Sequence, residues 1–163
     1  MKRIFTFFAI SIFVLSCSSY KPPKQYNFVN QFDYNLPYEA VWSKVIQFFA
    51  ELGLPIRNMD KSSGFIATDV MSASGGIGTL MDCGEPGYAL NYNAEFEKPT
   101  GYFNVLVIPL NQNQTRVKVT AFYKAYYVVY KNENFMRYKQ SEEVFNCNST
   151  GFLEQALLNY IAK

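Results

Sequence analysis

The sequence contains no histidine. Histidine is the usual base beside serine and cysteine nucleophiles and the commonest metal ligand, so both kinds of site lose their main component. The closest carboxylate pairs are Glu95 with Glu97 and Glu142 with Glu143. General acid–base catalysis needs two such groups facing each other across a cleft in different environments, and we interpret these pairs as solvated surface charges. We therefore expect no enzymatic activity and no cofactor.

Recognisable phosphate-binding motifs are missing as well. Residues 71–87 contain five glycines, but they show neither the GxGxxG spacing nor the Gly-Lys-Ser/Thr ending of a phosphate loop. A segment of this composition predicts a long mobile loop instead. Because long loops often carry function, this loop is a candidate recognition rim.

Residues 1–16 are typical of a secretory signal peptide. Lys2 and Arg3 form a basic start, residues 4–15 are mostly apolar, and Ser16 is the small residue expected before a cleavage site. The apolar run is too short to cross a bilayer comfortably. We therefore expect residues 1–16 to be removed on export.

The residues around the cleavage site, Val14-Leu15-Ser16-Cys17, resemble the lipobox of bacterial lipoproteins. That resemblance implies that Cys17 carries acyl chains such as palmitate and becomes the mature N-terminus. Two or three acyl chains anchor a protein stably, whereas one does so only marginally. No acidic residue directly follows Cys17, which by the same resemblance favours an outer-membrane lipoprotein that faces the periplasm. The alternative is an ordinary secreted protein with an unrelated cysteine.

Residues 17–31 are predicted to form a flexible tether, because two prolines and many polar side chains leave no periodic apolar pattern. Loss of Lys2 and Arg3 with the signal peptide leaves 13 basic and 13 acidic residues, since the whole chain has 15 and 13. This balance gives no electrostatic basis for binding nucleic acid. The remaining residues, 32–163, are sufficient for one domain with a hydrophobic core.

Residues 36–70 predict a helix followed by two strands. Pro37 suits a first helical turn, and Gly53 with Pro55 ends the helix. Between them an apolar stripe recurs at helical spacing, at Val41, Val45, Phe48 and Leu52, and is widened by Phe49 and by Trp42, which we expect to be buried. After the helix, residues 60–64 supply a turn between two short strands.

Two stretches of this region, LPYEAVWSKVIQFFAELGLPI and DKSSGFI, resemble the helix-grip domains of lipoprotein component C of the outer-membrane β-barrel assembly machinery. They also resemble a wider set of bacterial envelope lipoproteins with the same layout. The shared pattern is a small polar start, a helix bearing aromatic residues, and an acidic–basic turn that ends in glycine before a strand. This resemblance implies a helix held by an antiparallel sheet.

Three further segments alternate as half-buried strands do, namely residues 88–96, 102–110 and 115–130. Residues 99–101 predict a turn between the first two segments. Residues 111–114 are a run of Asn and Gln that predicts the tip of a hairpin between the last two.

The polar residues 131–146 predict a long connection, and a final helix follows. Its apolar stripe is formed by Leu153, Leu157 and Ile161, after the polar cap of residues 149–151. Together these elements predict an α+β domain over residues 32–163. It consists of a single antiparallel sheet of about five strands, with the N-terminal and C-terminal helices on one face, as in a helix-grip fold.

If Cys17 is lipidated, Cys83 and Cys147 remain as an even pair. Cysteines in an oxidising compartment tend to pair, so we expect a disulfide that fastens the glycine-rich segment to the start of the final helix. Two free thiols are the alternative. No metal site is expected, because two cysteines without histidine cannot supply a usual zinc ligand set.

Two functional hypotheses follow. The first is a non-enzymatic interaction module at the outer membrane that binds an envelope protein through a sheet edge or the glycine-rich segment. The second is a small-ligand-binding lipoprotein with an apolar pocket between helix and sheet. The 13 tyrosines suit binding, because tyrosine offers a large rigid contact area with a polar end. A concave apolar cavity would favour the second hypothesis, and an exposed aromatic patch would favour the first.

Overall fold

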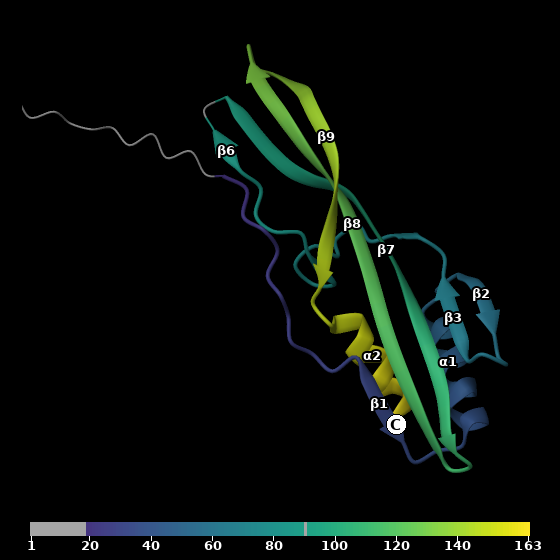
Figure 1. Ribbon diagram of the computed structural model, residues 1–163. Coiled ribbons are helices and arrows are strands. Elements are labelled where there is room, and N and C mark those ends of the chain that lie inside the picture. The colour runs from purple at the N-terminus through teal and green to yellow at the C-terminus, as the bar shows by residue number, and fades with distance from the viewer. Residues whose placement is uncertain (1–18, 90) are drawn as a thin grey trace, which may run out of the picture.

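The computed structural model describes residues 19–89 and 91–163 (Figure 1). The predicted signal peptide and Cys17 lie outside these ranges. In chain order the elements are β1 (Gln31–Tyr34), α1 (Tyr38–Glu51), β2 (Ile56–Asp60), β3 (Phe65–Thr68), β4 (Met71–Ser72), β5 (Met81–Asp82), β6 (Tyr88–Ala89), β7 (Tyr92–Asn111), β8 (Gln114–Glu133), β9 (Met136–Ser149) and α2 (Phe152–Ile161).

A long antiparallel hairpin forms the centre of the fold. β7 and β8 each contain 20 residues and pair along nearly their whole length, from Tyr92 opposite Lys131 to Asn111 opposite Gln114. A strand of this length extends about 60 Å. In Figure 1 the hairpin runs diagonally across the molecule, with both helices beside its lower half.

The two halves of this hairpin have different neighbours. In the helix half, β1 pairs with β8, while β3 pairs with β7 and with β2. In the other half, β9 pairs with β8 and β6 pairs with β7. We call the second half the distal ribbon and define it as residues 92–97, 124–133 and 136–146. The sheet is therefore wide near the helices and narrows to a twisted ribbon away from them (Figure 1).

The predicted fold, a sheet of about five strands with both helices on one face, is wrong. Within the described residues the sheet has nine strands, in the order β2-β3-β7-β8-β9-β5 with β1, β4 and β6 added at its sides. The distal ribbon also extends well beyond the helices (Figure 1). Two misinterpreted segments explain much of this difference.

The first is residues 131–146, which were predicted to be a connection and contain most of β9. Most side chains of β9 are exposed, so its sequence lacks the alternation that marks a half-buried strand. Its hydrogen bonds come from β8, in a register that runs from Tyr123 opposite Cys147 to Glu133 opposite Met136. Pairing with a long neighbouring strand therefore determines the structure of this segment.

The second is the predicted turn at residues 99–101, through which β7 continues without interruption. The pairing with β8 shifts between Glu97 and Thr100, so the chain forms a bulge at this point. A bulge accommodates Pro99, which has no N–H to give to the ladder. The proline therefore marks an irregularity within one strand and does not separate two strands.

The main core lies in the helix half, where α1 and α2 contact each other and the strands β7 and β8. The predicted helix is confirmed as α1, and Gly53 after it has a φ of +62°, as a left-handed cap requires. Trp42 is also buried as predicted, with 7% of its surface exposed. The fully buried side chains of this core include Val41, Val45, Phe49, Ile66, Phe103, Val105, Val117, Val119, Leu157 and Ile161.

Candidate functional site

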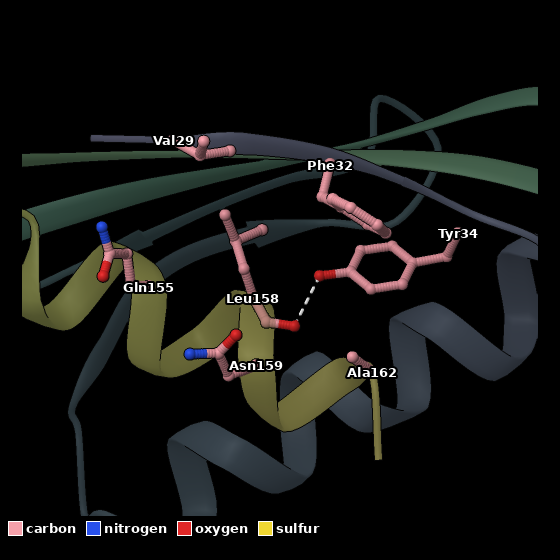
Figure 2. A pocket seen from close by; sticks show the side chains of 7 residues that line it. All are labelled: Val29, Phe32, Tyr34, Gln155, Leu158, Asn159 and Ala162. Carbon is pink, nitrogen blue, oxygen red and sulfur yellow. Dashed lines mark hydrogen bonds between the residues drawn. The ribbon is translucent and has the colours of Figure 1, made fainter. Parts of the chain in front are cut away.

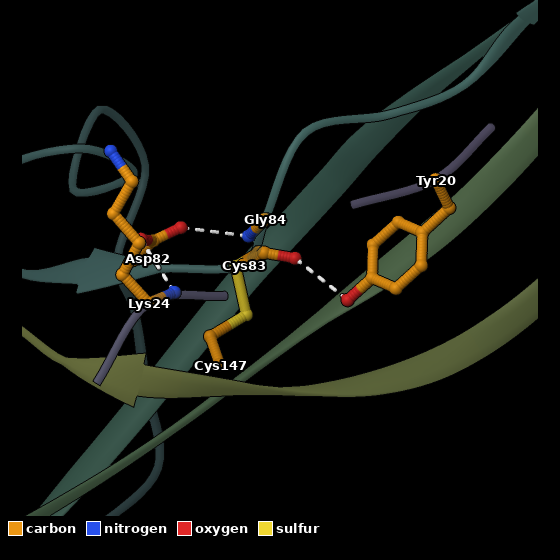
Figure 3. The surroundings of a disulfide bond; sticks show 6 residues. All are labelled: Tyr20, Lys24, Asp82, Cys83, Gly84 and Cys147. Atoms are coloured by element: carbon orange, nitrogen blue, oxygen red, sulfur yellow. Dashed lines mark hydrogen bonds between the residues drawn. A yellow bond between two sulfur atoms is a disulfide. The ribbon is translucent and has the colours of Figure 1, made fainter. Parts of the chain in front are cut away.

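Cys83 and Cys147 lie at disulfide distance in the middle of the sheet (Figure 3). The two sulfur atoms are 1.96 Å apart and the two Cα atoms 4.2 Å apart. A bridge needs Cα atoms within about 7 Å, so the geometric requirement of the predicted disulfide is met. Both cysteines are buried in a second, smaller core cluster with Met81, Tyr123 and Ala125. The bridge itself stays a prediction that thiol counting tests.

The glycine-rich segment, residues 71–87, contains β4 and β5 and packs against this cluster. β4 pairs with β7, and β5 pairs with β9 at Asn148 and Ser149. The segment was predicted to be a mobile loop that could serve as a recognition rim. Because the glycine-rich segment pairs with two strands, it packs over the middle of the sheet.

Residues 19–26, which begin the predicted tether, make several contacts with the segment around Cys83 (Figure 3). The Tyr20 hydroxyl donates to the Cys83 carbonyl over 3.2 Å, and the Tyr20 ring packs edge-on against Phe96, Tyr127 and Phe145. Asn148 donates from its side chain to the Lys24 carbonyl. These contacts place the start of the described chain beside the distal ribbon.

The Asp82 carboxylate is the main polar link between residues 19–26 and β5. It accepts hydrogen bonds from the backbone N–H of Gly84 at 2.8 Å, from the backbone N–H of Lys24 at 3.1 Å and from the Tyr26 hydroxyl at 3.1 Å. Partial burial acts to raise the pKa of Asp82. The three hydrogen bonds and the nearby Lys24 charge outweigh burial and lower the pKa below its ordinary value of 3.8.

This link predicts a local effect for Asp82→Asn. The amide that replaces one carboxylate oxygen cannot accept from Lys24 and Tyr26, so the link should weaken by about 1 kcal/mol in this partly solvated position. Backbone amides of residues 20–26 should then exchange with solvent about fivefold faster at pH 7, as measured by hydrogen exchange. The exposed Glu143→Gln on β9 is the matched control and should leave their exchange unchanged.

The same link has a predictable pH dependence. Because the folded pKa of Asp82 is lowered, its contribution is complete above 3.8 and is lost as the pH falls through the lower folded value. The wild type and Asp82→Asn should therefore differ at neutral pH and converge in strong acid. Equal exchange at pH 7 would show that this carboxylate does not hold residues 20–26 in place.

A shallow groove lies between β1 and α2 (Figure 2). Its volume is about 340 Å³, and it is lined by Val29, Phe32, Tyr34, Gln155, Leu158, Asn159 and Ala162. Tyr34 donates a hydrogen bond of 2.6 Å to the Leu158 carbonyl and so joins the strand to the helix. Burial raises the pKa of Tyr34 to about 12, which keeps this hydroxyl protonated as a donor. Val29 and Phe32 remain 60% and 52% exposed above the groove.

The groove continues past the end of α2. A second hollow of about 390 Å³ shares Phe32, Tyr34 and Ala162 with the first and extends to Lys44 and Lys163. β1 itself pairs with β8 on one side, and no strand of residues 19–89 and 91–163 pairs with its other side. The helix half therefore presents an open strand edge beside an apolar groove.

A smaller apolar pocket, of about 140 Å³, lies between the glycine-rich segment, β7 and the start of α2, with Leu54 also in its lining. The buried Tyr123 hydroxyl lines it and makes no hydrogen bond with the described residues, and burial raises its pKa. Ligand sites for small molecules usually measure about 300–1,000 Å³. This pocket is therefore too small for the gripped ligand of the second hypothesis.

The predicted surface carboxylates lie on the distal ribbon beside cations and a tyrosine. Glu95 pairs with Arg137, Glu97 accepts from Tyr130, and Glu142 pairs with Lys139. Within the described residues, no three His, Cys, Asp or Glu side chains gather as a metal site would require. Nor does any helix in those residues have the length and apolarity needed to cross a membrane.

Sequence reasoning missed the groove beside β1. Residues 17–31 were assigned to a tether, and this assignment hid Val29. The available signal was that Val29, Phe32 and Tyr34 bring apolar side chains into a polar stretch.

Compared with known proteins, the chain matches no family model and no curated protein.

Proposed function

We propose that the protein is a non-enzymatic lipoprotein, anchored through Cys17 in the outer membrane and facing the periplasm. In this proposal it acts as an interaction module that binds an extended segment of another envelope protein. The signal sequence and the lipobox resemblance support the location.

The observation that carries the binding role is the open edge of β1 beside the apolar groove. An unpaired strand edge offers a row of backbone donors and acceptors to an added strand. Side chains of an added strand alternate, so every second one would point toward α2. There the exposed parts of Val29 and Phe32 and the groove floor at Leu158 offer apolar contact.

The charges around this edge favour a particular kind of segment. Asp33 is paired with Arg116 at 2.6 Å. Lys44 and Lys163 line the far end of the groove, where Asp33 is the one acidic side chain among the lining residues. A partner segment with apolar residues followed by an acidic group matches this sequence of surfaces. A small-molecule role has weaker support, because the smaller apolar pocket measures only about 140 Å³ and the groove of about 340 Å³ beside β1 is shallow.

Site-specific photo-crosslinking in intact cells tests the binding role. A photoreactive amino acid in place of Phe32 should give a discrete protein adduct, because its side chain lies at the groove rim. The matched control is Phe122, which is 41% exposed and stacks on Tyr102 away from the groove. Adducts of the same size from both positions, or none from Phe32, would contradict the proposed surface.

A charged substitution supplies the second arm of this experiment. Leu158 is almost fully buried, so Phe32→Asp is preferred as a change at the rim that spares the core. With the photoreactive residue moved to Val29, Phe32→Asp should abolish the adduct while leaving the circular dichroism spectrum unchanged. An adduct that survives this change would show that the apolar rim does not bind the partner.

A further inference from the structure

The two ends of the long hairpin differ sharply in chemistry. The end in the helix half is the polar run of residues 111–114, which consists only of Asn and Gln. The distal end is the turn between β8 and β9, where Phe135 is 112% exposed and the adjacent Met136 is 61% exposed. Tyr138 is exposed two residues further along β9. Phe135, Met136 and Tyr138 therefore form an exposed apolar group at the distal end of the hairpin.

The backbone of the distal turn does not explain its phenylalanine. Asn134 and Phe135 have φ angles of +50° and +63°, the left-handed region that hairpin turns of this kind fill with Asn and Gly. A bulky aromatic residue is disfavoured there, and its fully exposed ring gains no free energy from burial within the protein. An apolar environment around the tip would supply that burial and offset the backbone cost.

The N-terminal anchor attaches to the protein near the same end. Ser19 and Tyr20 line a hollow with Tyr88 and Tyr92 of the β6–β7 hairpin, and the described chain begins there (Figure 1). Cys17 precedes Ser19 by two residues, and two residues of chain span at most about 7 Å. A lipid on Cys17 would therefore hold this part of the distal ribbon close to the membrane.

We propose that the β8–β9 turn places Phe135 and Met136 in the interfacial layer of the membrane in which Cys17 is anchored. This inference rests on the lipid anchor of the proposed function and adds a second, protein-made contact. A lipid anchor and an exposed aromatic tip reinforce each other. Because the anchor already keeps the protein at the membrane surface, insertion of the tip costs less translational and rotational entropy than it would for a free protein.

Chain lengths determine how the ribbon lies on the membrane. The distance along β8 from Tyr127, which contacts Tyr20, to the end of the strand is about 20 Å. The chain from Tyr20 back to Cys17 reaches only about 10 Å. Both contacts form only if the ribbon is inclined to the bilayer. Inclination brings the exposed Tyr88 and Tyr92 toward the same surface, where tyrosine is favoured.

The charges beside the tip are balanced. Lys131 pairs with Glu133, Arg137 with Glu95 and Lys139 with Glu142, so the exposed apolar side chains, and not a net positive charge, are what the tip offers to a membrane.

Fluorescence quenching by brominated lipids tests the inference. The full-length lipoprotein would be purified from membranes and reconstituted into vesicles of phosphatidylethanolamine and phosphatidylglycerol. In F135W the added tryptophan should lose at least half of its emission when the lipids are brominated. F122W in the middle of the sheet should lose none, and the buried Trp42 supplies the constant background in both proteins.

The outcomes distinguish insertion of the β8–β9 turn from anchoring by the lipid on Cys17. An F135W protein that carries lipid but is not quenched overturns the insertion of the tip and leaves the anchor intact. If F135W folds poorly, M136W is the second reporter, and its quenching or lack of it decides in the same way. A photoreactive residue at position 135 that gives a protein adduct instead of lipid adducts would assign the tip to a partner and overturn the inference. Absence of lipid on Cys17 in mass spectra would defeat the proposed anchor independently of the quenching result.

Discussion

Replacing Cys83 and Cys147 together by alanine is expected to lower the free energy of unfolding by roughly 4 kcal/mol. The pair is separated by 64 residues along the chain, and closing a segment of this length removes much of the conformational entropy of the unfolded state. Urea unfolding of wild type and variant under oxidising conditions measures the difference. Reductant should destabilise the wild type by a similar amount and leave the variant unchanged.

The structural consequence should be local before it is global. Cys83 belongs to the segment that covers the middle of the sheet, and its carbonyl accepts from Tyr20. Loss of the bridge should therefore accelerate hydrogen exchange in residues 81–85 and 20–26 before it affects the paired centre of β7 and β8. Two alkylatable thiols in freshly isolated wild-type protein, other than that of Cys17, would show that the bridge does not form.

This local effect connects the disulfide to the end of the molecule that we propose to face the membrane. Tyr20 packs against Phe96, Tyr127 and Phe145, while Asp82 and the Cys83 carbonyl hold the chain on either side. If Cys17 is lipidated as proposed, a bridged cluster would fix where the anchor leaves the distal ribbon. Without the bridge, the proposed inclination of the ribbon to the bilayer would no longer be defined.

The parts of the fold that sequence predicted well are those determined by local chemistry. Helix α1 followed from Pro37, Gly53 and an apolar stripe, each of which acts on the backbone of its immediate neighbours in sequence. The turn before β3 is also determined by local chemistry. The Asp60 side chain accepts hydrogen bonds from Ser62, and glycine at position 64 readily adopts the positive φ found there. Such signals remain valid whatever the rest of the chain does.

The parts that were predicted wrongly depend on pairing between distant segments. β9 is exposed along most of its length, and only β8 beside it makes it a strand. Pro99 indicates a chain break when it is considered alone, but the neighbouring strand carries β7 through it as a bulge. The length of the central hairpin, and with it the distal ribbon, could not be inferred from either local pattern.

The candidate site was predictable to a similar extent. The pairing of Cys83 with Cys147 followed from their even number, and the geometry places them together. The groove beside β1 needed the packing of β1 against α2, which no local pattern shows. The contrast between the two hairpin ends needed the knowledge that residues 133–136 form a turn.

The Cys17→Ala variant is expected to lose its lipid completely and to leave the membrane fraction. In proteins with this motif the cysteine sulfur accepts the diacylglyceryl group, so an alanine at position 17 leaves no atom to which the lipid can be attached. Two or three acyl chains supply much more membrane affinity than the small apolar tip of the β8–β9 turn. Phe135 and Met136 alone should not hold the variant on the membrane, so most of it should appear in the soluble fraction when cells are fractionated.

Metabolic labelling with a fatty-acid probe tests the central claim most directly. Wild-type protein and the Cys83→Ala/Cys147→Ala variant should incorporate the probe equally, because neither of those cysteines is the lipidation site. The Cys17→Ala variant should show no label above background. Equal labelling of Cys17→Ala and wild type would contradict the lipid anchor and with it the proposed place of this protein in the envelope.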